Sequence, residues 1–188
     1  MKHQGHIVDS KATTITRTAV VAAMYVILTF LLAPLSFGPG FRISEGLNFL
    51  SLYNKRHIYA ITLGVFIVNY FAYGPWDMIV GSLSSLVFLS IGRYLAKKAS
   101  HWTVRRGYKQ DPILVEYLVL ALVFSLSMFT ITIMVIMLGF EDAFWPLYIS
   151  QVLIEFGSMA LGAIVIYPLS KRIDSVSYTH LTLPTNRE

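Results

Sequence analysis

The sequence of 188 residues has no cysteine and few charged residues. The absence of cysteine excludes disulfide bonds and thiolate metal sites. Charged residues make up 13% of the chain and hydrophobic residues 55%, and the mean hydropathy is +0.62. A soluble domain of this length would struggle to stay in solution with that balance. The composition therefore predicts an integral protein of the cell membrane that crosses the bilayer several times.

The chain also lacks the motifs of several functional classes. It contains no Gly-x-x-x-x-Gly-Lys-Ser/Thr loop, so any ATP-driven work must come from partner subunits. No histidine falls within the long apolar runs, which removes an intramembrane serine-histidine dyad and the usual zinc ligands. We therefore expect no catalytic residue, metal or cofactor in this chain. The alternative, a six-helix intramembrane enzyme, predicts substrate turnover that is lost in Glu155→Ala.

The net charge of +5 comes from lysines and arginines that lie in short clusters between apolar runs. This distribution lacks the continuous basic face that is typical of nucleic-acid binding, and we expect no nucleic-acid partner. Lysine and arginine beside spanning segments lie preferentially on the cytoplasmic side of a membrane. The clusters therefore report how the chain is oriented in the lipid bilayer.

Six apolar runs follow one another along the chain. Five of them are long enough, or nearly so, to cross a bilayer as a helix, and the second is only about half that length. A segment this short is tolerated at membrane depth only where protein or a water-filled cavity satisfies its backbone. We predict an all-α, six-helix transmembrane bundle with a short second helix. The runs are Arg17 to Leu35, Ser44 to Tyr53, Ile58 to Tyr73, Met78 to Leu95, Ile113 to Leu138 and Phe144 to Leu169.

The basic clusters alternate with these runs. They lie before the first run, between the second and third, between the fourth and fifth as a solvated connector from Lys97 to Lys109, and after the sixth. Arg42 is the single cation among the other connectors, so we predict six crossings with both termini cytoplasmic. Residues 1–16 are predicted to be a cytoplasmic segment and residues 17–174 the membrane domain. Residues 175–188 resemble a non-native tail translated from adapter DNA, the alternative being a disordered tail.

Polar side chains inside this apolar chain mark a candidate binding site. The predicted topology places several of them in the outer half of the bundle, and a turn-rich loop from Ser36 to Gly40 precedes the first of them. An ionisable or amide side chain at such positions indicates a cavity or a partner. The residues are Arg42, Glu45 and Asn48 at the second helix, Asn69 near the end of the third, and Asp77 at the start of the fourth.

Glu155 is the deepest charged residue of the chain. It lies about 15 Å into the sixth run at 1.5 Å per residue, near the middle of a hydrocarbon layer about 30 Å thick. A carboxylate at that depth costs several kcal/mol unless it faces a cavity or a partner. Gln151 lies one turn earlier on the same helical face, followed by Ser158 and Gly162. Glu155 and Gln151 are therefore candidate contacts of a ligand.

Each of these residues also has a structural explanation. Glu155 could be neutral and bonded to a hydroxyl of the fifth helix. Arg42 and Glu45 could pair with each other while Ser44 caps the second helix, and Asp77 could only cap the fourth. The hydroxyls available to Glu155 are those of Ser125, Thr130 and Thr132.

A second feature is a pair of small residues on the first helix. Ala19 and Ala23 are four residues apart, which gives a small-xxx-small face on which another helix can approach closely. The alternative is packing within the bundle.

Three stretches together carry a resemblance to the QueT family, and it covers the chain from about Arg17 to Asp174. They are Phe41 to Asn48; Tyr53 to Ala60 with Thr62, Leu63 and Gly64; and Glu155 to Met159 with Gly162, Ala163 and Lys171 to Asp174. The resemblance implies a prokaryotic substrate-capture subunit, or S component, of an energy-coupling-factor (ECF) transporter that imports queuosine precursors, which are deazaguanine bases. It also implies a coupling membrane subunit and two ATPase subunits as partners, with Ala19 and Ala23 docking on the coupling subunit.

The chemistry of such a base suits the polar residues. A guanine-like base presents an N–H and an amine side by side, which a carboxylate can accept together, while an amide reads the neighbouring carbonyl. Glu155 with Asn69 or Gln151 could supply that set, and Glu45 or Asp77 could bind an aminomethyl cation. Two alternatives remain: an S component for another small nutrient such as a vitamin, and an independent membrane carrier.

Overall fold

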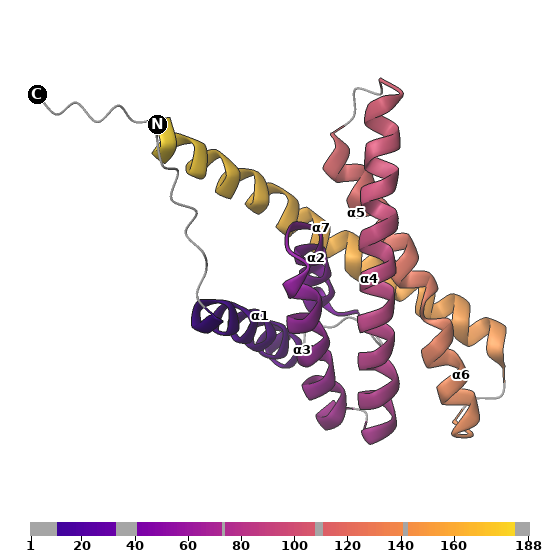
Figure 1. Ribbon diagram of the computed structural model, residues 1–188. Helices are drawn as coiled ribbons and strands as arrows, with labels where there is room; N and C mark the ends of the chain where they lie inside the picture. Colours follow the sequence, from indigo (N-terminus) through magenta and orange to yellow (C-terminus); the bar gives the residue numbers. More distant parts are fainter. Residues whose placement is uncertain (1–10, 33–40, 73, 108–110, 141–142, 183–188) are drawn as a thin grey trace, which may run out of the picture.

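The computed structural model describes residues 11–32, 41–72, 74–107, 111–140 and 143–182, and within these ranges the protein is helical, with no strand (Figure 1). The expected turns at Ser36 to Gly40 and at Glu141 and Asp142 lie outside the described residues. The elements are α1 (Lys11–Leu32), the 3-10 helix η2 (Ile43–Phe49), α2 (Leu50–Tyr53), α3 (Arg56–Ala72), α4 (Pro75–Arg105), α5 (Pro112–Leu126), α6 (Phe129–Met137) and α7 (Phe144–Thr182).

Four helical segments of the described chain are long and apolar enough to cross a membrane. They are α1, α4, α5 with α6, and α7 up to Arg172. Most of their surface lies outside the core, as in α1, where only 11% of the most apolar window is buried. Apolar side chains that face outward over several turns need lipid around them. The prediction of a multi-pass, all-α membrane protein is confirmed.

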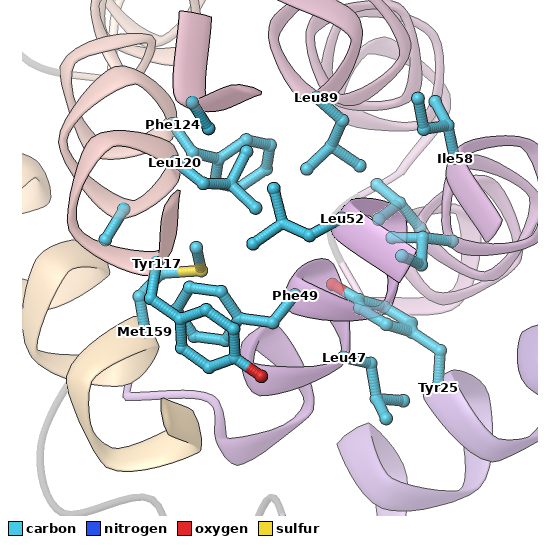
Figure 2. Packing of buried hydrophobic residues seen from close by; sticks show 14 of the residues in the cluster. Tyr25, Leu47, Phe49, Leu52, Ile58, Leu89, Tyr117, Leu120, Phe124 and Met159 are labelled. Carbon is cyan, nitrogen blue, oxygen red and sulfur yellow. The ribbon is translucent and has the colours of Figure 1, made fainter. Parts of the chain in front are cut away.

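The helices surround a core to which both ends of the chain contribute. α3 and α4 stand side by side, with α1 crossing on one side and α6 lying on the other, and α7 passes behind them (Figure 1). Figure 2 shows the centre of the packing, where the rings of Phe49 and Tyr117 stack at 4.1 Å between centroids and 4° between planes. Tyr25, Leu120 and Met159 are fully buried in the same cluster. The short second segment is thus enclosed by helices that are distant in sequence.

η2 and α2 are held away from lipid by α1 and α7. Residues 44–49, 51 and 52 are all buried. The Thr29 hydroxyl of α1 donates to Ser44 Oγ at 2.7 Å, and the Arg42 amide donates to Ser158 Oγ of α7 at 3.1 Å. Gly46 and Gly162 bring the two backbones together, because a Cβ on Gly46 would lie 2.6 Å from Gly162 Cα. Protein surrounds this half-length segment, as its length required.

Charged groups tie the helices together at the end of the bundle where α4 ends and α5 begins. Lys97 Nζ lies 2.5 Å from Oε2 of the buried Glu116, and the Arg93 guanidinium donates to the carbonyl oxygen of Ser51. Lys171 of α7 pairs with Asp111, which also accepts a hydrogen bond from Ile113 N and caps α5. These contacts fix α2, α4, α5 and α7 relative to one another.

Several predicted boundaries were wrong in detail. The solvated connector from Lys97 is mostly helix, because α4 continues to Arg105 and Lys97 pairs across to α5. The fifth run is interrupted at Ser127 and Met128, where the hydroxyl of Ser127 donates to Phe124 O and the helix restarts as α6. α1 already begins at Lys11. Ser44 does not cap η2, whose N-cap is Arg42 without a side-chain cap, since Ser44 is bonded to Thr29 instead.

The pair of Asp111 and Lys171 predicts a pH-dependent stability. The hydrogen bond from the Lys171 ammonium, supported by Ile113 N–H, holds the pKa of the Asp111 carboxyl below its ordinary value. The stabilisation is therefore present above the unfolded pKa of about 3.9 and is lost as the pH falls through the lower folded pKa. Because the pair is partly exposed, the effect is small. Thermal melts in detergent should show Asp111→Asn below the wild type at neutral pH and equal to it in acid; a difference that is independent of pH contradicts this account.

Candidate functional site

A cavity of about 720 Å³ lies toward the end of the bundle where α3 ends and α4 begins. Its volume falls in the range of small-molecule sites. α1, η2, α3, α4, α5, α6 and α7 all contribute to its lining. The polar residues of the lining are Tyr25, Arg42, Glu45, Asn69, Asp77, Ser84, Ser85, Gln151 and Glu155, and the apolar ones include Val65, Trp76, Phe124, Met128, Ile131, Met134, Val135, Leu138, Phe140 and Ile154.

Glu45 is the most completely satisfied carboxylate of the cavity. The Tyr25 hydroxyl donates to its Oε1 at 2.6 Å, and Asn48 Nδ2 donates to its Oε2 at 2.8 Å. Arg42 Nη1 lies 3.8 Å from the same Oε1 as an ion pair. Hydrogen bonds and an ion pair of this kind offset the cost of burying a carboxylate. Arg42 and Glu45 thus pair as their structural explanation required, and Glu45 also joins η2 to α1 through Tyr25.

Glu155 has the opposite environment. It is 8% exposed and lines the cavity, and its Oε1 is buried without a hydrogen-bond partner among the described residues. Its electrostatic neighbours are Glu45 and Arg42. An unpaired carboxyl group at this depth is costly to keep, and donors from a ligand would remove that cost. Glu155 is therefore the acceptor in the cavity that most needs a partner.

The hydroxyls that offered a structural explanation for Glu155 bind elsewhere. Thr132 Oγ1 is bonded to Gln151 Oε1 at 2.8 Å, and Thr130 Oγ1 to Ser84 Oγ at 2.9 Å. Ser125 donates back to the α5 carbonyl of Ala121. The alternative that a hydroxyl of the fifth run satisfies Glu155 is therefore wrong. The bond from Thr132 also leaves the Gln151 amide nitrogen as the donor that this side chain offers to the cavity.

Asn69 and Asp77 form a second polar corner of the cavity. Asn69 Nδ2 donates to the backbone oxygen of Asp77 at 3.2 Å, and Asn69 Oδ1 is buried without a partner among the described residues. Asp77 lies in the first turn of α4, but it is not the N-cap, which is Gly74. Its side chain makes no hydrogen bond or ion pair with any residue that the structure describes. The explanation that Asp77 only caps the helix is thus wrong.

The structure brings six of the seven predicted site residues to one cavity. Asn48 is the seventh; it is fully buried behind Glu45 and approaches Met159 Sδ at 3.5 Å, outside the lining. Ala19 and Ala23 do not line the cavity, and both are exposed on α1. Sequence reasoning missed Tyr25 and the apolar wall on α6, because a tyrosine or methionine in an apolar run carries no signal of where it points.

The fold and the cavity together define a class. Apolar helices that enclose a small-molecule cavity, with a few polar groups at membrane depth, are the architecture of a membrane transport protein. The comparisons agree with this class. The chain belongs to the QueT transporter family, whose model matches residues 15–171. It is accordingly a multi-pass transporter of the cell membrane and not an enzyme.

One curated relative covers nearly the whole family region. The protein of Lactococcus lactis subsp. cremoris (strain MG1363) named Queuosine precursor transporter QueT is 39% identical over 168 residues, which are 88% of this chain and 96% of the relative. No solved structure matches the chain.

Proposed function

We propose that the protein is the substrate-capture subunit of an ECF-type, ATP-driven importer and that it takes queuosine precursors, which are deazaguanine bases, from the outer side. The observation that carries this proposal is Glu155, which lines the cavity and whose Oε1 has no hydrogen-bond partner among the described residues. The chain supplies no cofactor of its own, and ATP is used by two partner ATPase subunits. The name of the lactococcal relative supports the substrate class.

Glu155 and Gln151 match the edge of a deazaguanine. The base offers an N–H and an exocyclic amine side by side, and both can donate to the Glu155 carboxylate. The carbonyl next to that N–H can accept from the Gln151 amide nitrogen, whose oxygen is occupied by Thr132. A site built to bond N–H groups discriminates strongly against ligands that lack them. The volume of the cavity admits many nutrients, and these hydrogen bonds supply the selection.

The apolar lining that α5 and α6 contribute suits the flat faces of the ring. Met128, Met134 and Phe140 line the cavity from the α5–α6 break to the end of α6, with Phe124 beside them. Methionine side chains adapt their shape to a ring and make favourable contacts with aromatic systems. The base would lie with its faces on this wall and its edge toward α7.

The charges and contacts support six crossings with both termini inside. Arg56 Nη1 of α3 bonds to Thr14 near the start of α1, and Lys171 of α7 pairs with Asp111 at the start of α5. These basic ends therefore meet on one side, which the positive-inside tendency assigns to the cytoplasm. η2 and α2 together span about 20 Å, and their burial in protein permits that short crossing. The cavity then lies toward the outer side.

The proposal is tested by calorimetry with deazaguanine bases on the purified protein. We expect binding of a deazaguanine and none of adenine, which lacks the adjacent donor pair. Mass spectrometry of co-purifying small molecules separates the alternatives, since a vitamin there overturns the substrate assignment. Transport into vesicles by this chain alone would favour an independent carrier, and dependence on the ATPase subunits would support the importer.

Docking on the coupling subunit through Ala19 and Ala23 gives a separate prediction. Both residues lie on the exposed face of α1, where a larger side chain would keep another helix at a distance. Ala19→Leu or Ala23→Leu should leave base binding unchanged and prevent co-purification with the coupling subunit. Ala160→Leu, at an exposed position of α7, is the matched control and should retain the complex. An intact complex with the α1 variants would overturn the docking proposal.

A further inference from the structure

The charged groups of the cavity do not balance. Among the described residues that line the cavity, three carboxyl groups, those of Glu45, Asp77 and Glu155, face one guanidinium, that of Arg42. Arg42 is in ion-pair contact with Glu45, which Tyr25 and Asn48 also satisfy. Within the described residues, the carboxyl groups of Asp77 and Glu155 therefore have no cation in ion-pair contact, although Arg42 is an electrostatic neighbour of both. A low-dielectric cavity with an excess of negative charge favours a ligand that brings positive charge.

The two remaining carboxyl groups belong to different walls of the cavity. Glu155 projects from the middle of α7, and Asp77 from the first turn of α4. Asp77 is 9% exposed, and its side chain has no partner among the described residues. The corner beside it holds Asn69, whose Oδ1 is buried and also unpartnered within the described part of the chain. Two hydrogen-bond acceptors that have no donor within the described residues thus lie at the junction of α3 and α4.

We propose that Asp77 and Asn69 form an ammonium subsite, so that the cavity takes a deazaguanine bearing a primary amine in preference to an uncharged one. This inference rests on the proposed function. It assigns the three carboxyl groups separately: Glu155 receives the donor edge of the base, Asp77 receives the ammonium, and Glu45 holds η2 against α1. Asn69 is a positioning residue as well as an acceptor, because its amide nitrogen is bonded to the Asp77 backbone.

The chemistry of this corner suits an ammonium better than a metal ion. An ammonium has three N–H donors and needs hydrogen-bond acceptors around one anionic group. A divalent cation needs several oxygen or nitrogen ligands together, and the described residues contain no group of three or more histidine, aspartate or glutamate side chains placed to hold one. Gly81 keeps the corner open, because a Cβ there would collide with Asn69 Nδ2.

Two ligands and three proteins test this subsite. The ligands are a 7-aminomethyl-deazaguanine and a 7-methyl-deazaguanine, which differ in the ammonium group. Calorimetry is performed on the wild type and on Asp77→Asn and Asp111→Asn, where Asp111 is a carboxylate at the opposite end of the bundle. We expect Asp77→Asn to weaken binding of the aminomethyl base by at least about tenfold and to leave the methyl base unchanged, since the lost interaction is a charge-assisted one. Asp111→Asn should bind both bases as the wild type does.

The outcomes separate this inference from the proposed function. Wild-type protein that binds both bases with equal affinity, or an Asp77→Asn variant that weakens both equally or neither, overturns the ammonium subsite and leaves the deazaguanine assignment in place. Wild-type protein that binds neither base overturns both. Retained binding of the methyl base by Asp77→Asn shows that the variant is folded. The methyl base therefore serves as the folding control for this variant.

Discussion

Glu155→Gln is expected to raise the Kd for a deazaguanine roughly 10- to 150-fold, which corresponds to about 1.5 to 3 kcal/mol for hydrogen bonds to a charged group. Glutamine has the shape of glutamate, but its amide nitrogen would point a donor at one of the two donors of the base. The side chain has no partner among the described residues that the substitution would break, so the fold should be retained. Calorimetry on the purified variant measures the loss.

The matched control is Ser158→Ala, one turn further along α7. Ser158 is buried and bonds to the Arg42 amide but does not line the cavity, so its loss should lower the melting temperature more than the affinity. Unchanged affinity in Glu155→Gln removes Glu155 from the binding site. The same variant should weaken the methyl and aminomethyl bases equally, in contrast to Asp77→Asn.

Gly162→Ala is expected to be the most damaging single-methyl change in the protein. A Cβ on Gly162 would point directly at Gly46 Cα and N, and both obstacles are backbone atoms that cannot rotate away. η2 would have to separate from α7, which disturbs the contacts of Arg42 with Ser158 and of Glu45 with Tyr25. Overpacking typically costs about 1 to 3 kcal/mol, and we expect a cost at or above the upper end. The variant should lose thermal stability in detergent and base binding together.

Gly157→Ala provides the comparison for that experiment. Its Cβ would lie 2.7 Å from Cε1 of the Phe41 ring, a side-chain tip that can shift. It should therefore melt close to the wild type. Melting curves followed by circular dichroism, with calorimetry on the same samples, distinguish the two glycines. A Gly162→Ala protein with wild-type stability and affinity would show that the backbone contact of η2 with α7 is dispensable.

The features that could be predicted from the sequence are those that depend on local composition. The six apolar runs correspond to α1, η2 with α2, α3, α4, α5 with α6, and α7, because hydropathy over a bilayer-length window is a local property. The shortness of the second run correctly implied that it is surrounded by protein, since a half-length segment cannot face lipid. The polar residues were found because a charged or amide side chain at membrane depth is costly unless it faces a cavity or a partner.

The unpredictable part depends on partners distant in sequence. The ion pair of Lys97 with Glu116 was missed because nothing near Lys97 in the chain shows Glu116 across from it. The break between α5 and α6 has neither glycine nor proline at Ser127 and Met128 to announce it. Glu45 and Asp77 could not be told apart until the hydroxyl of Tyr25 was seen to satisfy one and not the other. Roles that follow from three-dimensional contacts require the structure.

The backbone contact of η2 with α7 also orders events during synthesis. η2 is made before α7, and because residues 44–49 are all buried and only Ile43 of η2 is exposed, η2 has little surface of its own to turn toward lipid. Its polar backbone and Glu45 need α7 as a neighbour before they can settle at membrane depth. The cavity, whose lining includes Gln151, Ile154 and Glu155 of α7, is therefore complete only after α7 has joined the other helices.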